Sequence, residues 1–74
     1  MERDIRSLNP LMETGLALRI ICKDGDVFEG DYMASGSLAE KGKKEMAEIF
    51  YIEISCGGIE IDFYENEIER IEEI

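Results

Sequence analysis

Alternation of apolar and polar side chains between Gly15 and Ala34 predicts two β-strands joined by a tight turn, each with one face in a core. The apolar positions of the first strand recur at every second residue and are Leu16, Leu18, Ile20 and Cys22. Those of the second strand share one parity and are Phe28, Gly30, Tyr32 and Ala34. A two-residue turn would put the two sets on opposite faces. We therefore predict a three-residue loop, Asp24–Asp26, that sets Cys22 opposite Phe28.

Two further strands are predicted downstream. Residues 49–54 are β-branched and aromatic, which is typical of a central strand. The glycine-containing residues 56–58 then turn the chain. Residues 59–63 alternate between apolar side chains and the acidic Glu60 and Asp62, so this strand is expected to have an acidic outer face.

The N-terminal part is predicted to contain a short helix. Residues 1–8 form an arm or the start of that helix, Asn9 is a plausible N-cap, Pro10 suits the first helical position and Gly15 can end it. The helix is expected to lay three apolar side chains over one end of the β-structure, namely Leu8, Leu11 and Met12.

The remaining segments are a loop and the C-terminal end. Residues 35–48 contain glycine, serine and charge without alternation and are predicted to be one long variable loop. Residues 64–67 suggest a tight turn. In residues 68–74, isoleucines recur every third position and fit a helix better than a strand, but the density of isoleucine favours a helical turn that brings Ile68 inward, then a brief strand from about Arg70.

The turn sequence Lys23-Asp24-Gly25, with Phe28 and Gly30 after it, resembles the first motif of the Sm-like (LSm) proteins. Asn9-Pro10-Leu11 resembles the lead-in helix of that family, and the resemblance covers most of the chain. The turn and the late run from Gly57-Gly58 to the isoleucines are also similar to the Rho-binding antiterminators of bacteria, which are acidic. The resemblance implies a mainly β fold: a five-stranded, strongly bent, SH3-like barrel with a short N-terminal helix, in which the fifth strand pairs with the first.

The length and the net charge of the chain limit the classes of function and partner that can be expected. Seventy-four residues make one domain, 1–74, which buries little surface by itself, so a homo-oligomer is expected. Eighteen acidic against eight basic residues give a net charge of −10, which disfavours nucleic acid and suits a basic protein partner. No apolar run approaches the roughly 18 residues of a membrane span, and residues 1–4 lack the pattern of a signal peptide, so we expect a soluble cytoplasmic protein without membrane contact.

The residue types of common catalytic and metal sites are missing. The chain has no histidine, no glycine-rich phosphate loop and no EF-hand spacing, and its Cys22 and Cys56 form no CxxC pair. Both cysteines are expected to be reduced, Cys22 in the core and Cys56 in a turn. We therefore expect no enzyme, no metal and no cofactor.

Sm-like proteins hold RNA between an Asp and an Asn after the second strand and an Arg-Gly or Lys-Gly pair between the fourth and fifth strands. Here no asparagine follows Tyr32 before Asn66, and residues 64–67 put acids where the basic pair would fall. The resemblance therefore implies the fold without the RNA pocket. The first hypothesis is a non-catalytic protein-binding module linked to RNA metabolism or transcription. Its candidate partner-binding residues are Glu60, Asp62, Tyr64 and Glu65.

Two alternatives stay open. A weak RNA binder, acting as an oligomeric ring, would use the lysines of the long loop, which are Lys41, Lys43 and Lys44. A purely structural or assembly domain would bind no small ligand. In Sm-like rings the fourth strand of one subunit pairs with the fifth of the next. The apolar residues that could serve this interface are Ile59, Ile61, Phe63, Ile71 and Ile74.

Overall fold

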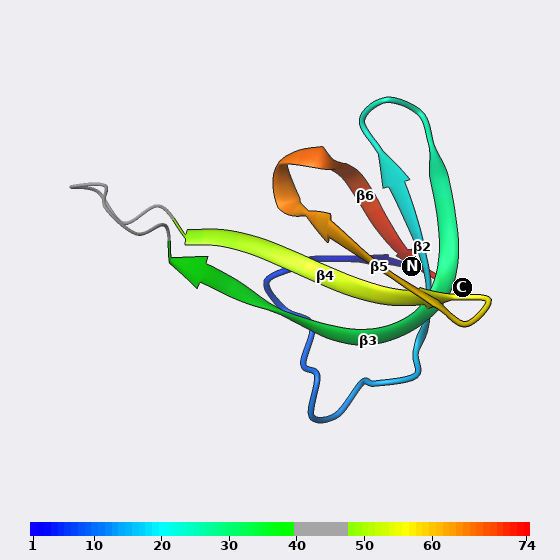
Figure 1. Cartoon of the computed structure of the whole chain (residues 1–74), viewed down its shortest axis with the longest axis horizontal. Coiled ribbons are helices and arrows are strands. Elements are labelled where there is room, and N and C mark those ends of the chain that lie inside the picture. The colour runs from blue at the N-terminus through cyan, green and yellow to red at the C-terminus, as the bar shows by residue number, and fades with distance from the viewer. Residues whose placement is uncertain (40–47) are drawn as a thin grey trace.

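The computed structural model describes residues 1–39 and 48–74, which form one open, antiparallel sheet in the order β1-β6-β2-β3-β4-β5 (Figure 1). The six strands are β1 (Glu2–Arg3), β2 (Ala17–Cys22), β3 (Val27–Ala39), β4 (Glu48–Cys56), β5 (Ile59–Tyr64) and β6 (Ile68–Glu73). The described residues contain no α-helix, only a 3-10 turn, η1 (Glu65–Glu67). The mainly β class is confirmed. The five-stranded closed barrel is not, because the sheet has six strands and ends at β1 and β5.

The first predicted hairpin is present, with a three-residue loop placed one residue earlier than expected. Gly25 donates its N–H to the Cys22 carbonyl at 3.0 Å and has a φ of +97°, the geometry of a turn closed by a left-handed glycine. Cys22 N–H then bonds the Asp26 carbonyl, so Cys22 lies opposite Asp26, and Phe28 lies opposite Ile20. Phe28 thus lies opposite Ile20 and not opposite Cys22, a change of two residues in the register of the hairpin. Because side chains alternate with a period of two, the apolar residues of both strands still share one face.

Strand β3 is far longer than predicted and corrects the assignment of residues 35–48. Residues 35–39 continue β3 and pair with β4, from Ser35 opposite Ile52 to Ala39 opposite Glu48. The register shifts at Met33, which leaves one extra residue on β3 and marks a β-bulge. The strand curves strongly along its length (Figure 1).

Close contact between β3 and β4 requires a glycine. A Cβ atom placed on Gly30 would lie 2.3 Å from the Ser55 carbonyl oxygen, which is closer than any side chain can approach a backbone atom. The β4–β5 connection also depends on glycine. Gly57 and Gly58 have φ values of +59° and +89° and join Cys56 to its partner Ile59 through a two-residue turn.

The C-terminal segment is a strand over nearly its whole length. Strand β6 begins at Ile68, two residues before the predicted start, and pairs with β2, as expected for the fifth strand against the first. A strand that was not predicted, β1, pairs with the other edge of β6, where Arg3 lies opposite Ile71.

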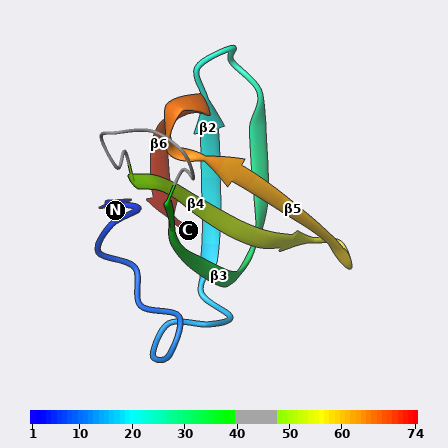
Figure 2. The same ribbon diagram turned by 60° about the vertical axis from the view of Figure 1, so that its left-hand side comes forward.

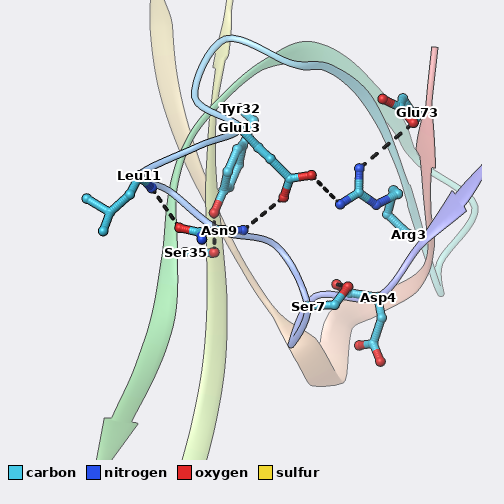
Figure 3. A network of polar contacts seen from close by, with 9 residues as sticks. All are labelled: Arg3, Asp4, Ser7, Asn9, Leu11, Glu13, Tyr32, Ser35 and Glu73. Atoms are coloured by element: carbon cyan, nitrogen blue, oxygen red, sulfur yellow. Dashed lines mark hydrogen bonds and ion pairs between the residues drawn. The ribbon is translucent and has the colours of Figure 1, made fainter.

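The predicted N-terminal helix is wrong, because the segment forms only isolated turns. Asn9 does cap one turn, since its Oδ1 accepts the Leu11 N–H at 2.9 Å, but the backbone bonds from Met12 and Glu13 to the Asn9 carbonyl do not continue into a helix. Instead, Arg3 donates to the Glu13 carboxylate, which also accepts the Asn9 N–H (Figure 3). Between β1 and β2 the segment forms an irregular loop that extends beyond one end of the sheet (Figure 2).

The core lies on the concave face of the bent sheet. Its buried residues come from five strands and the N-terminal segment: Ile5, Leu8, Leu18, Ile20, Cys22, Tyr32, Ile52, Ile54, Phe63 and Ile71. Phe28 of β3 and Phe63 of β5 pack with ring centroids 5.0 Å apart, although β4 separates their strands in the sheet order. The sheet therefore folds over onto itself. Of the three side chains predicted to cover one end of the β-structure, Leu8 is buried in the core, but Leu11 and Met12 are 93% and 82% exposed, so the prediction is wrong for these two.

Candidate functional site

The outer face of β3, β4 and β5 carries a group of four carboxylates, which we call the carboxylate face and which comprises Asp31, Glu53, Glu60 and Asp62. The alternation of each strand sends these side chains outward, because their neighbours Tyr32, Ile52 and Phe63 are buried. Ser55 of β4 lies between Asp31 and Glu60 in the register, and Glu53 lies directly opposite Asp62. Register between three strands thus gathers residues that are distant in sequence.

Glu53 and Asp62 occupy the closest kind of cross-strand position. Counting from the two-residue turn after Cys56, they form a pair without backbone bonds between them, in which facing side chains approach most closely. A hydrogen bond with Asp62 raises the pKa of Glu53, and burial and the charges of Asp62 and Glu60 act in the same direction. Full ionisation of Glu53 is therefore less favourable beside Asp62 than it would be for an isolated carboxyl.

Basic residues within the described part of the chain lie elsewhere. Strands β3, β4 and β5 contain no lysine or arginine over residues 27–39 and 48–64. The described arginines belong to β1, the turn after it, β2 and β6, and each has an acidic partner: Arg3, Arg6, Arg19 and Arg70. Their acidic partners lie in the N-terminal segment, β3, η1 and β6, and no ion pair among the described residues involves the carboxylate face.

Two of the predicted partner-binding residues, Glu60 and Asp62, belong to the carboxylate face, and the other two lie beyond it. Tyr64 ends β5 and is 41% exposed. Glu65 begins η1 and accepts two hydrogen bonds from the Arg6 guanidinium, at 3.0 and 3.1 Å. Arg6 also lies 4.4 Å above the ring of Phe50. Glu65 is therefore already paired within the chain, and the pKa of its carboxyl is lowered by that bond with Arg6.

The predicted interface residues have different environments. Phe63 and Ile71 are 4% and 3% exposed, so their side chains are committed to the core of a single chain. Ile61 is half-buried against that core. Ile59 and Ile74 are 67% and 61% exposed and are available for contact. The lysines of the alternative RNA site, Lys41, Lys43 and Lys44, lie outside the described residues.

Sequence reasoning missed Asp31 and Glu53 as members of the face. Their outward parity was readable from the alternation in their own strands. Their proximity to Glu60 and Asp62 was not. For Glu53 it depends on the β4–β5 register, and for Asp31 it also depends on the β3–β4 register, which shifts at the bulge at Met33.

Neither metal-binding nor reactive groups stand out in residues 1–39 and 48–74. No cluster of three metal-ligating side chains is present there. Both cysteines are free, and burial raises the pKa of Cys22, which disfavours its reactive thiolate. No helix in these residues has the length and apolar character needed to cross a membrane. Models of known families, curated proteins and solved structures were compared with the chain, and none of them matches it.

Proposed function

We propose that this chain is a non-catalytic, cytoplasmic protein-binding module of the Sm-like type, linked to RNA metabolism or transcription, and that its carboxylate face binds a basic segment of a protein partner. The observation that carries the proposal is the segregation of charge: four carboxylates share one face of β3, β4 and β5, and those strands contain no basic residue over residues 27–39 and 48–64.

Electrostatics explain why such a face favours a cationic partner. Like charges directly opposite each other in a sheet are destabilising. The hydrogen bond with Asp62 and burial raise the pKa of Glu53, and the charges of Asp62 and Glu60 add to that effect. A lysine or arginine placed between Glu53 and Asp62 would replace the repulsion with attraction. A nucleic acid would bring further negative charge to the same surface, so the face favours a protein over a phosphate backbone.

The Sm-like part of the proposal is supported by two features of the chain. The turn that carries the resemblance, Lys23-Asp24-Gly25, forms the loop of the first hairpin and ends in a left-handed glycine. Strand β6 also pairs with β2, which corresponds to the pairing that the resemblance implied for the fifth and first strands.

The test measures binding of a fluorescent oligolysine peptide by anisotropy, at low and at physiological ionic strength. We expect the double variant Glu60→Lys/Asp62→Lys to bind about tenfold more weakly than the natural chain at low ionic strength, a loss of roughly 1.4 kcal/mol. Affinity of the natural chain should fall as salt is added, because surface charges are screened.

A matched control separates this face from net charge. Glu2→Lys/Glu69→Lys changes the total charge by the same amount through exposed residues of β1 and β6. An equal loss in both double variants would assign binding to net charge and reject the carboxylate face. Circular dichroism of each variant verifies that the sheet is intact.

A further inference from the structure

A groove of about 540 Å³ lies beside the carboxylate face, between the β2–β3 turn and β5, and we call it the tip groove. Its floor is apolar and consists of Cys22, Phe28, Ile61 and Phe63. Phe28 and Phe63 are in mutual contact there, with centroids 5.0 Å apart. The volume is within the range of pockets that hold drug-sized ligands, so the groove has room for a large apolar side chain.

The rim of the tip groove is strongly acidic. Four carboxylates and one amine border the apolar floor: Asp24, Asp26, Asp62, Glu67 and Lys23. Asp24, Asp26 and Glu67 also raise the pKa of the Cys22 thiol beneath them, after the larger effect of burial. Asp62 belongs to both the rim and the carboxylate face, so the two surfaces are continuous.

The groove is bordered by a strand edge to which no described residue pairs. Strand β5 ends the sheet, and the groove is lined by three successive β5 residues, 61–63, without any residue of β4. In an antiparallel strand pair, a residue that makes no backbone hydrogen bonds with the residue opposite it directs its own N–H and C=O away from that neighbouring strand. On an edge strand these groups therefore point outward. By the register of β5, Asp62 is such a residue, and it forms no other backbone hydrogen bond within the described chain.

We propose that the tip groove and the adjoining edge of β5 bind an extended segment of a partner protein in which one large apolar side chain is flanked by lysine or arginine. The apolar side chain enters between Phe28 and Ile61, the flanking cations meet the rim carboxylates, and the backbone of the segment bonds to Asp62 as an added strand. This inference rests on the proposed function and names the sequence chemistry of its partner.

A second copy of the same chain is a poorer occupant. The rim and the carboxylate face are negative, and the chain carries a net charge of −10, so two copies would bring like charges together at Asp62. A basic segment meets the same groups with opposite charge.

The experiment compares two labelled peptides on the natural full chain. Both are oligolysine, one with a single central leucine and the other with serine at that place. We expect the leucine peptide to bind about tenfold more tightly, because burying a leucine removes its apolar surface from water. In ¹⁵N-correlation NMR spectra, the leucine peptide should shift the amides of residues 23–28 and 61–63. The serine peptide should leave the amides of residues 23–28 unshifted, because it binds only the carboxylate face, which includes Asp62.

A second test uses variants of the acidic residues on the rim of the tip groove. Asp24→Asn/Asp26→Asn keeps the side-chain oxygen that accepts the Asp26 N–H at 3.0 Å and removes two charges from the groove. It should weaken the leucine peptide severalfold more than Glu2→Gln/Glu69→Gln, which removes two exposed charges elsewhere.

The outcomes are distinguishable. Equal affinity of the two peptides, or tighter leucine binding with amide shifts outside residues 23–28 and 61–63, overturns the tip groove and leaves the proposed function standing. Failure of both peptides to bind overturns both proposals.

Discussion

Two residues, Glu53 and Asp62, concentrate the electrostatics of the carboxylate face. The register places Glu53 directly opposite Asp62 in the closest kind of cross-strand pair, and the pKa of Glu53 is raised, first by its hydrogen bonding with Asp62 and then by burial. Because this folded-state pKa lies above the unfolded value of 4.5, the bond stabilises the chain fully below that value, and its contribution is lost as the pH rises through the folded pKa.

We therefore expect Glu53→Gln to raise the melting temperature at pH 7, by a few degrees at most. The amide donates to Asp62 at every pH, whereas the carboxyl donates only when protonated. The gain should vanish as the pH falls below about 4.5, where Glu53 is protonated in the natural chain. Thermal unfolding followed by circular dichroism across this range measures the effect. Glu69→Gln, at an exposed position of β6, serves as control, and the same pH profile in both variants would contradict the assignment.

At the scale of elements, local patterns were sufficient for four strands. Alternation predicted β2, the first half of β3 and β5, and β-branched and aromatic content predicted β4. The second half of β3 could not be predicted in this way. Its Ser35, Gly36 and Ser37 have neither apolar alternation nor strand propensity, and they are held by pairing with residues 50–52 of β4.

In the N-terminal part, local sequence signals predicted a helix that does not form, and a strand formed where no local signal was present. Asn9 and Pro10 have the local chemistry of a helix start, and Asn9 does cap a turn, but the segment after it stays exposed and gains nothing from becoming helical. Strand β1 has two residues and no internal pattern, so only its pairing with β6 defines it. Likewise, alternation within each strand predicts that each acid of the carboxylate face points outward. It does not predict which acids are neighbours, because that depends on the register between strands.

The N-terminal segment contributes to the core through one side of its turns, and this can be measured. We expect Leu8→Ala to lower the free energy of unfolding by about 2–3 kcal/mol, because Leu8 is 7% exposed among core residues. Leu11→Ala should change it by less than about 0.5 kcal/mol, because that side chain is 93% exposed. Urea unfolding of both variants provides the values. An equal loss of unfolding free energy in the two variants would instead support the predicted helix, in which both leucines cover the sheet.

At the scale of the whole molecule, the edges of the sheet restrict how copies can associate. The Sm-like ring that the resemblance implied joins the edges that correspond here to β5 and β6. Within residues 1–39 and 48–74 no strand pairs with the outer edge of β5, but β1 occupies the edge of β6 at Ile71 and Glu72. A ring through these edges would first have to displace β1.

We accordingly expect a native mass no greater than that of a dimer of the 8.4 kDa chain, at both low and high salt. Light scattering on a sizing column measures it directly. A ring of several subunits at either salt concentration would show that β1 leaves β6 on assembly. Dimerisation restricted to high salt would agree with pairing of β5 edges once the repulsion of the carboxylates is screened.

The separation of arginines from the carboxylate face also has a kinetic consequence. Strands β1, β2 and β6 contain arginines among their acids, whereas β3, β4 and β5 contain acids and no base over residues 27–39 and 48–64, so these parts of the chain form an electric dipole. A cationic partner would begin to feel this dipole at about 8 Å, the screening length of physiological salt, and be turned before contact. Recognition would then be governed by how fast correctly oriented encounters occur as much as by how long they last.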